Sequence, residues 1–324
     1  MAARSKTSLL AAFARRDWIG PLIALLVVYA AFAIAMPDTF SSAIAIKLML
    51  RQTVIVSLCA IGMTLVIALG GIDLSVGSVV ALVTVVLARQ LQSGASVAVA
   101  VLFAVVAGTA AGVLNGTLIR VLAISPFIVT LGTMGALRGL AKGWANEQKI
   151  DADPRGLEAS MTMSADSVNP FAPGVWISAV LAGLFGLLLA SSRFGRHVTA
   201  VGSSAAAARL AGISIGRVTI ATYALMGLLA GVAGVLEFAT LTVGDPTDSI
   251  GLELSVIAAV VIGGGSLAGG RGSVLGSIIG ALLMTVIKSG ATYAGISNWV
   301  QEILTGAIIV AAVSLDRLRA SSPT

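Results

Sequence analysis

Long runs of uncharged, apolar residues follow one another along almost the whole chain, and they constrain its fold more than any other feature. A helix needs roughly 20 apolar residues to cross about 30 Å of hydrocarbon, and in lipid its backbone polar groups must bond within the segment. The runs therefore predict about ten transmembrane helices, with the least definite limits beside glycine-rich breaks: 18–36, 48–70, 74–91, 96–119, 121–140, 173–192, 218–241, 254–270, 272–289 and 302–315.

The composition agrees with a chain that is covered by lipid. Hydrophobic residues make up 57% of it and charged residues only 10%, which is too apolar for a water-soluble domain of this size. The expected fold class is all-α, a polytopic membrane protein with a transmembrane domain at 18–315 between tails at 1–17 and 316–324. The first run is too long for a signal-peptide core and is followed by no Ala-x-Ala site, so it predicts a retained span.

The charged residues predict which loops lie on which side. If the N-terminus is cytoplasmic, the loop at 193–217 is cytoplasmic and basic, whereas the loop at 143–170 is external and acidic. The cytoplasmic side then holds only three acids, Asp17, Asp73 and Asp316, against Arg4, Lys6, Arg15, Arg16, Arg120, Arg193, Arg196, Arg209, Arg217, Arg271, Arg317 and Arg319. The external side holds Asp38, Glu147, Asp151, Asp153, Glu158, Asp166, Asp245, Asp248 and Glu253.

This is the positive-inside pattern, and it predicts a multi-pass protein of the bacterial inner membrane with both tails in the cytoplasm. The formal net charge is +6, but the basic residues stand singly between apolar runs and form no stripe. We therefore expect contact with the lipid bilayer and no binding of nucleic acid.

Residues for catalysis, metal binding or nucleotide binding do not gather in this sequence. Cys59 is the only cysteine and His197 the only histidine, so neither a disulfide nor a zinc site is expected. Residues 263–273 resemble a phosphate-binding loop, yet a Walker loop ends in Gly-Lys-Ser/Thr and this one has Gly-Arg-Gly at 270–272. We expect no enzymatic activity and no cofactor bound by this chain.

Glycine has two predicted uses in the apolar runs. The spacing Gly-x-x-x-Gly occurs at 108–112 and at 227–231, and in lipid it allows two helix backbones to pack closely. Glycine-rich breaks also interrupt both halves of the chain, at 70–77 and at 263–276. Paired interruptions of this kind indicate an internal structural repeat.

Asp73 lies among the glycines of the first break. A charge at membrane depth costs at least about 2.5 kcal/mol, so such a residue is normally paired, caps a helix or faces water. Two interpretations stay open: Asp73 is the N-cap of a helix that begins near Leu74, or it contacts a transported solute. The polar residues that we consider candidates for the pathway are Asp73, Ser75, Asn115, Thr130 and Ser255.

The basic loop contains a short helix of its own. Ser203 or Ser204 can be its N-cap, an alanine-rich stretch at 205–211 propagates it, and Gly212 ends it. Isolated helices shorter than about 12 residues are marginal in water. We therefore expect this helix to dock on a partner protein.

Five motifs together resemble one family over about 51–319, in the right order. They are Gly-Gly-Ile-Asp-Leu-Ser-Val-Gly at 70–77, Leu-Asn-Gly at 114–116, Pro-Phe-Ile-Val-Thr-Leu-Gly-Thr at 126–133, and the segments 207–213 and 261–273. The chain is similar to the ribose-type branch of ABC importer permeases, which implies a type II importer permease fold. That family also implies import of a monosaccharide, a pentose or a hexose, or a related solute.

The resemblance further implies several partners. They are a second permease copy or a homologous permease, a separate ATPase subunit that binds ATP and Mg, and a periplasmic solute-binding protein. It also identifies the helix near 203–213 as the coupling helix that fits a cleft of the ATPase. The family often has Asn and Glu at the positions of Ser204 and of the alanines at 205 and 206 in this chain. The expected contact residues are Arg196, Ser203, Ser204, Ala207, Arg209, Leu210 and Gly212.

Two other functions compete with this interpretation. A secondary transporter driven by an ion gradient would use Asp73 or Glu237 as its ion-binding acid. A channel or a structural membrane subunit would explain the apolar runs. Neither explains the basic, alanine-rich loop, and solute uptake without ATP would favour the ion-driven transporter.

Overall fold

The computed structural model describes residues 18–162 and 171–321, with side chains described up to residue 314. The N-terminal tail, part of the external loop and the last three residues therefore lie outside the described residues. Within them the regular secondary structure is α-helical except for a 3₁₀ turn and one pair of two-residue strands. The elements are α2 (Ile19–Ala35), α3 (Ala43–Ala68), α4 (Val76–Gln92), α5 (Val97–Leu122), α6 (Pro126–Trp144), β1 (Ile150–Asp151), η1 (Leu157–Ser160), α7 (Pro173–Ser191), α8 (Arg193–Ser203), α9 (Ala205–Leu210), α10 (Ile215–Leu241), β2 (Val243–Gly244), α11 (Leu252–Ile262), α12 (Val274–Tyr293) and α13 (Asn298–Ser321).

Ten of these helices correspond to the ten predicted runs, which confirms the all-α polytopic class. Helices α3, α5, α7, α10 and α12 are each long and apolar enough to cross a membrane, and α2, α4, α11 and α13 are shorter apolar helices. The tenth, α6, carries Arg138 and Lys142. Helices α3 and α12 form the centre, because 78% and 72% of their apolar windows are buried, against 28% for α5 and 22% for α7.

The run at 254–270 differs most from its prediction. Helix α11 ends at Ile262 because three glycines follow it and Gly264 has a positive φ of 92°. Its 11 residues rise about 16 Å, roughly half of a bilayer crossing. Helix α4 likewise begins at Val76, two residues after the predicted start.

A non-helical segment, residues 245–251, precedes α11 and runs alongside α4; we call it the descending segment. The backbone N–H of Asp245 donates to Thr84 Oγ1 at 3.3 Å, and the Ser249 carbonyl and the Glu253 carboxylate lie against Gly77. From Gly77 to Gln92, the last residue of α4, the helix rises about 22 Å. Asp248 and Glu253 therefore do not lie in an external surface loop, as predicted, but alongside a membrane helix.

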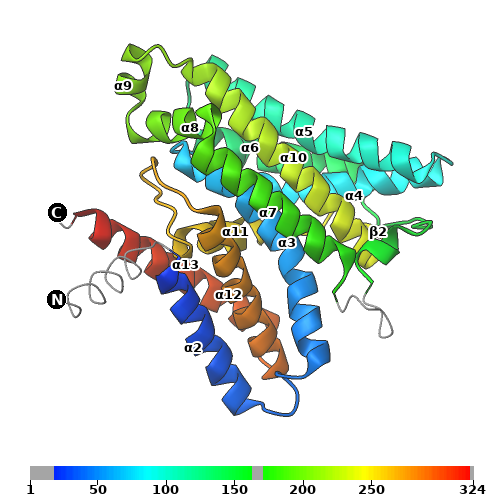
Figure 1. The fold of residues 1–324 in the computed structure, drawn as a ribbon. Coiled ribbons are helices and arrows are strands. Elements are labelled where there is room, and N and C mark those ends of the chain that lie inside the picture. Colours follow the sequence, from blue (N-terminus) through cyan, green and yellow to red (C-terminus); the bar gives the residue numbers. More distant parts are fainter. Residues whose placement is uncertain (1–17, 163–170, 322–324) are drawn as a thin grey trace, which may run out of the picture.

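The helix order places the two predicted loops at opposite ends of the molecule. Helix α10 has 27 residues and is about 40 Å long. Helices α8 and α9 precede it, and β2, at its other end, pairs with β1 from the segment after α6 (Figure 1). Figure 1 also shows the start of α2 and the end of α13 on the side of α8 and α9.

The two Gly-x-x-x-Gly motifs pack against each other, and this confirms the close helix packing that their spacing predicts. A Cβ on Gly108 would lie 2.8 Å from the Cα of Gly231, and a Cβ on Gly227 would lie 2.9 Å from the Cα of Gly112. Helices α5 and α10 therefore touch backbone to backbone, which in lipid provides dispersion contacts that larger side chains would prevent.

Gly112→Val tests this packing. The added side chain would overlap the Tyr223 carbonyl oxygen, so we expect a loss of about 1–3 kcal/mol of stability and a lower melting temperature in detergent. Gly183→Val in α7 is the matched control, because no atom lies within 4 Å of a Cβ added there. Equal melting temperatures for the two variants would contradict the tight α5–α10 contact.

A second experiment tests the arrangement of the two ends. Cys59 is fully buried, so a cysteine introduced at an exposed position reports without background from the native thiol. We expect Asp153→Cys to react with a membrane-impermeant thiol reagent in intact cells, and Ser204→Cys to react only after permeabilisation. Reaction of both cysteines from the same side would contradict this arrangement.

Candidate functional site

The predicted short helix of the basic loop is present as α9. Ser204 is its N-cap, because Ser204 Oγ accepts a hydrogen bond from the Ala207 backbone N–H at 3.2 Å. Gly212, with φ of 78°, follows the helix and adopts the left-handed conformation that suits glycine. Of the two serines that were predicted as caps, the structure therefore uses Ser204.

Helix α9 has one covered face and one uncovered face. Ala208 is buried, whereas Arg209 is exposed and Leu210 is 92% exposed. A leucine exposed to this extent lies here on a six-residue helix between spans, next to an exposed arginine. An apolar side chain in this position gains free energy when another protein covers it.

Helix α8 was not predicted, although the sequence carries a signal for it. Phe194, Val198 and Val201 recur at helical spacing and pack towards the core, while Arg196 stays exposed. Ser192 caps the helix by accepting a hydrogen bond from the Gly195 N–H at 2.9 Å. Helix α8 joins the end of α7 to α9 and so fixes where α9 begins.

The last turn of α8 lies against both glycine-rich breaks. The Gly270 N–H donates to the Ala68 carbonyl at 2.9 Å, and Gly202 lies against that same carbonyl oxygen. A Cβ on Gly269 would lie 2.6 Å from the Gly202 oxygen and 3.0 Å from the Gly70 Cα. We call Gly70, Gly202, Gly269 and Gly270 the glycine junction. It connects the residues before α9 to the end of α3 and to the loop between α11 and α12.

Exposed arginines surround this end of the molecule. Arg120 lies beside Gly216 at the start of α10, and the others belong to α8, α9, α10 and the loop between α11 and α12. All of the following are exposed: Arg120, Arg193, Arg196, Arg209, Arg217 and Arg271. The basic residues of the predicted cytoplasmic loops therefore gather at one end in space.

Four of the five pathway candidates meet in one buried cluster. Asp73 Oδ1 accepts hydrogen bonds from the Ser75 N–H at 2.8 Å and from the Ser75 hydroxyl at 2.6 Å. Asn115 Nδ2 donates to Ser75 Oγ at 2.8 Å, and the Thr130 hydroxyl donates to the Ile72 carbonyl at 3.1 Å. The side chains of Asp73, Ser75, Asn115 and Thr130 are all buried. The cluster therefore holds the connection between α3 and α4.

Asp73 is not the N-cap of α4, as one interpretation of the sequence predicted. Ser75 is the N-cap of α4, because its carbonyl accepts the first helical hydrogen bond, from Val79. Asp73 stabilises the turn that precedes the helix. Tyr223, which the sequence did not single out, donates to the Ile72 carbonyl at 3.4 Å from a position 151 residues away. Ser255 lies apart from the cluster, in α11.

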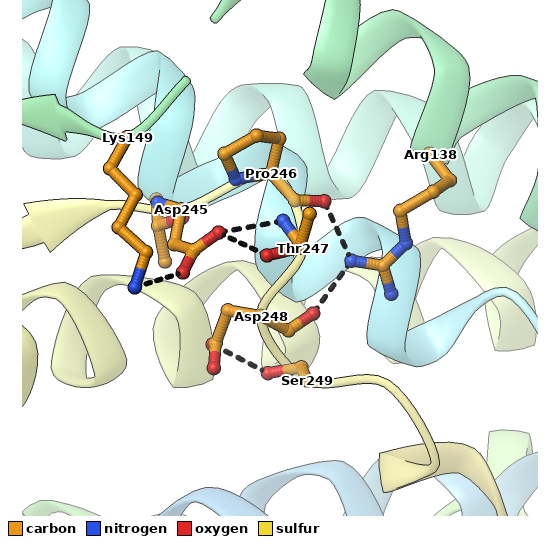
Figure 2. Close-up of polar contacts among 8 residues, drawn as sticks. Arg138, Lys149, Asp245, Pro246, Thr247, Asp248 and Ser249 are labelled. Atoms are coloured by element: carbon orange, nitrogen blue, oxygen red, sulfur yellow. Dashed lines mark hydrogen bonds and ion pairs between the residues drawn. The ribbon is translucent and has the colours of Figure 1, made fainter. Parts of the chain in front are cut away.

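The opposite end has its own polar contacts, drawn in Figure 2. Lys149 forms an ion pair with Asp245, with 3.0 Å between Nζ and Oδ2. The hydrogen bond to Asp245 and its negative charge raise the pKa of the Lys149 ammonium. Glu237, the second acid of the ion-driven alternative, lies in α10 beside Asp248. In the described part of the chain, no three His, Cys, Asp or Glu side chains are arranged to hold a metal ion.

Comparison with known proteins identifies relatives over nearly the whole length. Residues 45–313 match the family described as branched-chain amino acid transport system / permease component. The chain is 37% identical over 303 residues to the ribose import permease protein RbsC of Escherichia coli strain K12, covering 91% of this chain and 92% of that protein. No solved structure matches the chain significantly.

Two further relatives are similarly close. The L-arabinose ABC transporter permease protein AraH of Azospirillum brasilense is 36% identical over 300 residues, covering 93% of this chain and 87% of that protein. The ribose import permease protein RbsC of Bacillus subtilis strain 168 is 36% identical over 304 residues, covering 94% of each.

Two substitutions of Asp73 separate a structural role from ion binding. Asp73→Asn keeps an oxygen that can accept from Ser75, so we expect near-normal melting temperature and uptake. Asp73→Leu leaves buried donors without a partner, at about 1–3 kcal/mol for each, so we expect reduced stability. An ion-binding acid predicts instead that both variants lose uptake equally, with Asp73→Asn folded normally. Melting temperature and uptake at matched protein levels distinguish these outcomes.

Proposed function

The chain belongs to the branched-chain amino acid transport system / permease component family, and from this membership we propose that it is the membrane-spanning permease subunit of an ATP-driven ABC importer. The structural observation that supports the proposal is α9, a short helix with an uncovered face of Arg209 and Leu210. A separate ATPase subunit that binds ATP and Mg is the partner that would cover this face.

The proposed solute is a monosaccharide, with pentoses first. The names of the relatives support this choice, because two are ribose import permeases and one is an L-arabinose permease. All three alignments cover 87% or more of the relative, so the likeness extends over the whole membrane domain and is not confined to one motif.

The contacts of α9 suggest how an ATPase would drive transport. Closure of the ATPase displaces α9, and Ser204, which caps α9, follows Gly202 by two residues. The glycine junction passes this displacement to the end of α3 and to the loop between α11 and α12. Rigid-body motion of these packed helices then alternates access to the pathway. The permease itself holds solute and moves, while hydrolysis takes place on the partner.

The proposed orientation puts α9 in the cytoplasm. The exposed arginines at that end agree with the positive-inside rule, and the described ends of α2 and α13 lie on the same side. The protein would lie in the inner membrane of a bacterium. A periplasmic solute-binding protein would dock at the end that carries β1 and β2, and a second permease copy or a homologous permease would complete the pathway.

Arg209→Glu and Leu210→Ser test this function directly. Both side chains are exposed, so we expect both variants to fold and insert normally. Each should weaken copurification with the ATPase and sugar-dependent ATP hydrolysis by about tenfold or more, equivalent to about 1.4 kcal/mol. Lys142→Glu, an exposed charge reversal at the opposite end of the molecule, is the control and should leave copurification with the ATPase unchanged. Normal assembly and transport by the α9 variants would remove the main support for an ATP-driven importer.

A further inference from the structure

The descending segment runs alongside α4 within the membrane domain without forming a helix. It contacts Thr84 at its start and Gly77 near its end, and these residues are about 10 Å apart along α4. Lipid offers no hydrogen bonds, so non-helical backbone at this depth is tolerated only where protein buries it or where it lines a water-filled cavity. The surroundings of the segment therefore decide its role.

One side of the segment is held by protein. Arg138 of α6 donates from Nη1 to the carbonyl oxygens of Pro246 at 3.0 Å and of Asp248 at 2.6 Å (Figure 2). Asp245 Oδ1 accepts from the N–H of Thr247 at 2.8 Å and from its hydroxyl at 2.7 Å. These contacts fix the backbone, so the segment has a defined shape.

The other side is uncovered. Thr247 is exposed, Ile250 is 75% exposed and Asp248 is half-buried. Hydrocarbon on this side would cost free energy, because it would bring the Thr247 hydroxyl and the half-buried Asp248 carboxylate into contact with lipid tails. Water suits the Thr247 hydroxyl and the Asp248 carboxylate, whereas the Ile250 side chain suits an apolar cover, and water beside these two polar groups implies a pathway.

We propose that the descending segment forms part of the wall of the solute pathway, with Thr247 and Asp248 binding hydroxyl groups of a polyhydroxylated solute. The proposal rests on the transport function given above and assigns the solute contacts within it. Asp248 Oδ2 accepts a hydrogen bond from the Ser249 hydroxyl at 2.8 Å, and the carboxyl group also contacts Glu237 of α10 (Figure 2 shows the Ser249 contact). Each carboxylate oxygen has more than one lone pair, so the group can still accept hydrogen bonds from hydroxyls of a sugar. Arg138 is a positioning residue, because it holds the carbonyls on both sides of Thr247.

This assignment differs from the candidates that the sequence indicated. Asp73, Ser75, Asn115 and Thr130 are buried and bond to one another or to backbone, so they offer no open face to a solute. The descending segment instead combines membrane depth, polar side chains and an uncovered surface.

Thiol labelling of the complete importer tests the pathway wall. Thr247→Cys and Ile250→Cys are exposed to a charged, membrane-impermeant reagent, with Asp153→Cys as the positive control. Leu184→Cys is the negative control, because this α7 leucine is 59% exposed in an apolar helix that faces lipid. We expect both test cysteines to react at least tenfold faster than Leu184→Cys. Rates no faster than that control would overturn the proposal and indicate that lipid or a second copy covers the segment.

Protection by sugar tests whether solute passes the segment. Radiolabelled monosaccharides, beginning with ribose and L-arabinose, first identify a sugar that the wild-type importer takes up. At saturating concentration this sugar should slow the labelling of Thr247→Cys severalfold and leave Asp153→Cys unchanged. Labelling that is fast but unaffected by the sugar would place the segment outside the pathway.

Asp248→Asn tests the solute contact itself. We expect the sugar concentration for half-maximal uptake to rise about tenfold, with copurification of the ATPase unchanged. Asp38→Asn, an exposed acid before α3, is the control. An unchanged concentration would overturn the role of Asp248. Uptake by the wild type without ATP would instead overturn the proposed function, and the labelling rates would still decide whether the segment faces water.

Discussion

Every polar group of a backbone inside a membrane needs a partner from the protein, and this requirement governs the architecture. Unbroken helices meet it by themselves, but in the described part of the chain non-helical backbone is held at three places by donors from elsewhere. The Ala68 carbonyl receives the Gly270 N–H, the Ile72 carbonyl receives the hydroxyls of Thr130 and Tyr223, and the carbonyls of Pro246 and Asp248 receive Arg138. Each interruption is thus held by a donor from another element, and together these donors fix how the helices pack.

Features that depend on nearby residues could be predicted from the sequence. The apolar runs located ten of the helices, the cap and the terminating glycine located α9, and the spacing of four glycines predicted the close packing of α5 and α10. These signals are local because helix length, capping and the facing of residues four apart depend on chain geometry alone. The sequence also indicated that Asp73, Ser75, Asn115 and Thr130 were polar residues of interest, although not that they bond together.

Features that depend on distant residues escaped prediction. The shortness of α11 follows from glycines that were visible, but the descending segment depends on Arg138, which is 108 and 110 residues from the carbonyls that it binds. The Asp73 cluster depends on Asn115, 40 residues beyond Ser75, and on Tyr223. The glycine junction joins three parts of the chain, and the spacing of Gly70, Gly202 and Gly269 along the sequence does not predict that they meet. A single sequence carries no record of such pairings.

The glycine junction also determines how stiff the connection to α9 is. Most contacts between helices pass through side chains, which can change rotamer and take up a small displacement. At Gly70, Gly202 and Gly269 there is no side chain, so backbone meets backbone and no rotamer is free to yield. A displacement of α9 by a fraction of an ångström would therefore displace the end of α3 by nearly the same amount. A methyl group added at Gly202 or Gly269 would overlap the neighbouring backbone.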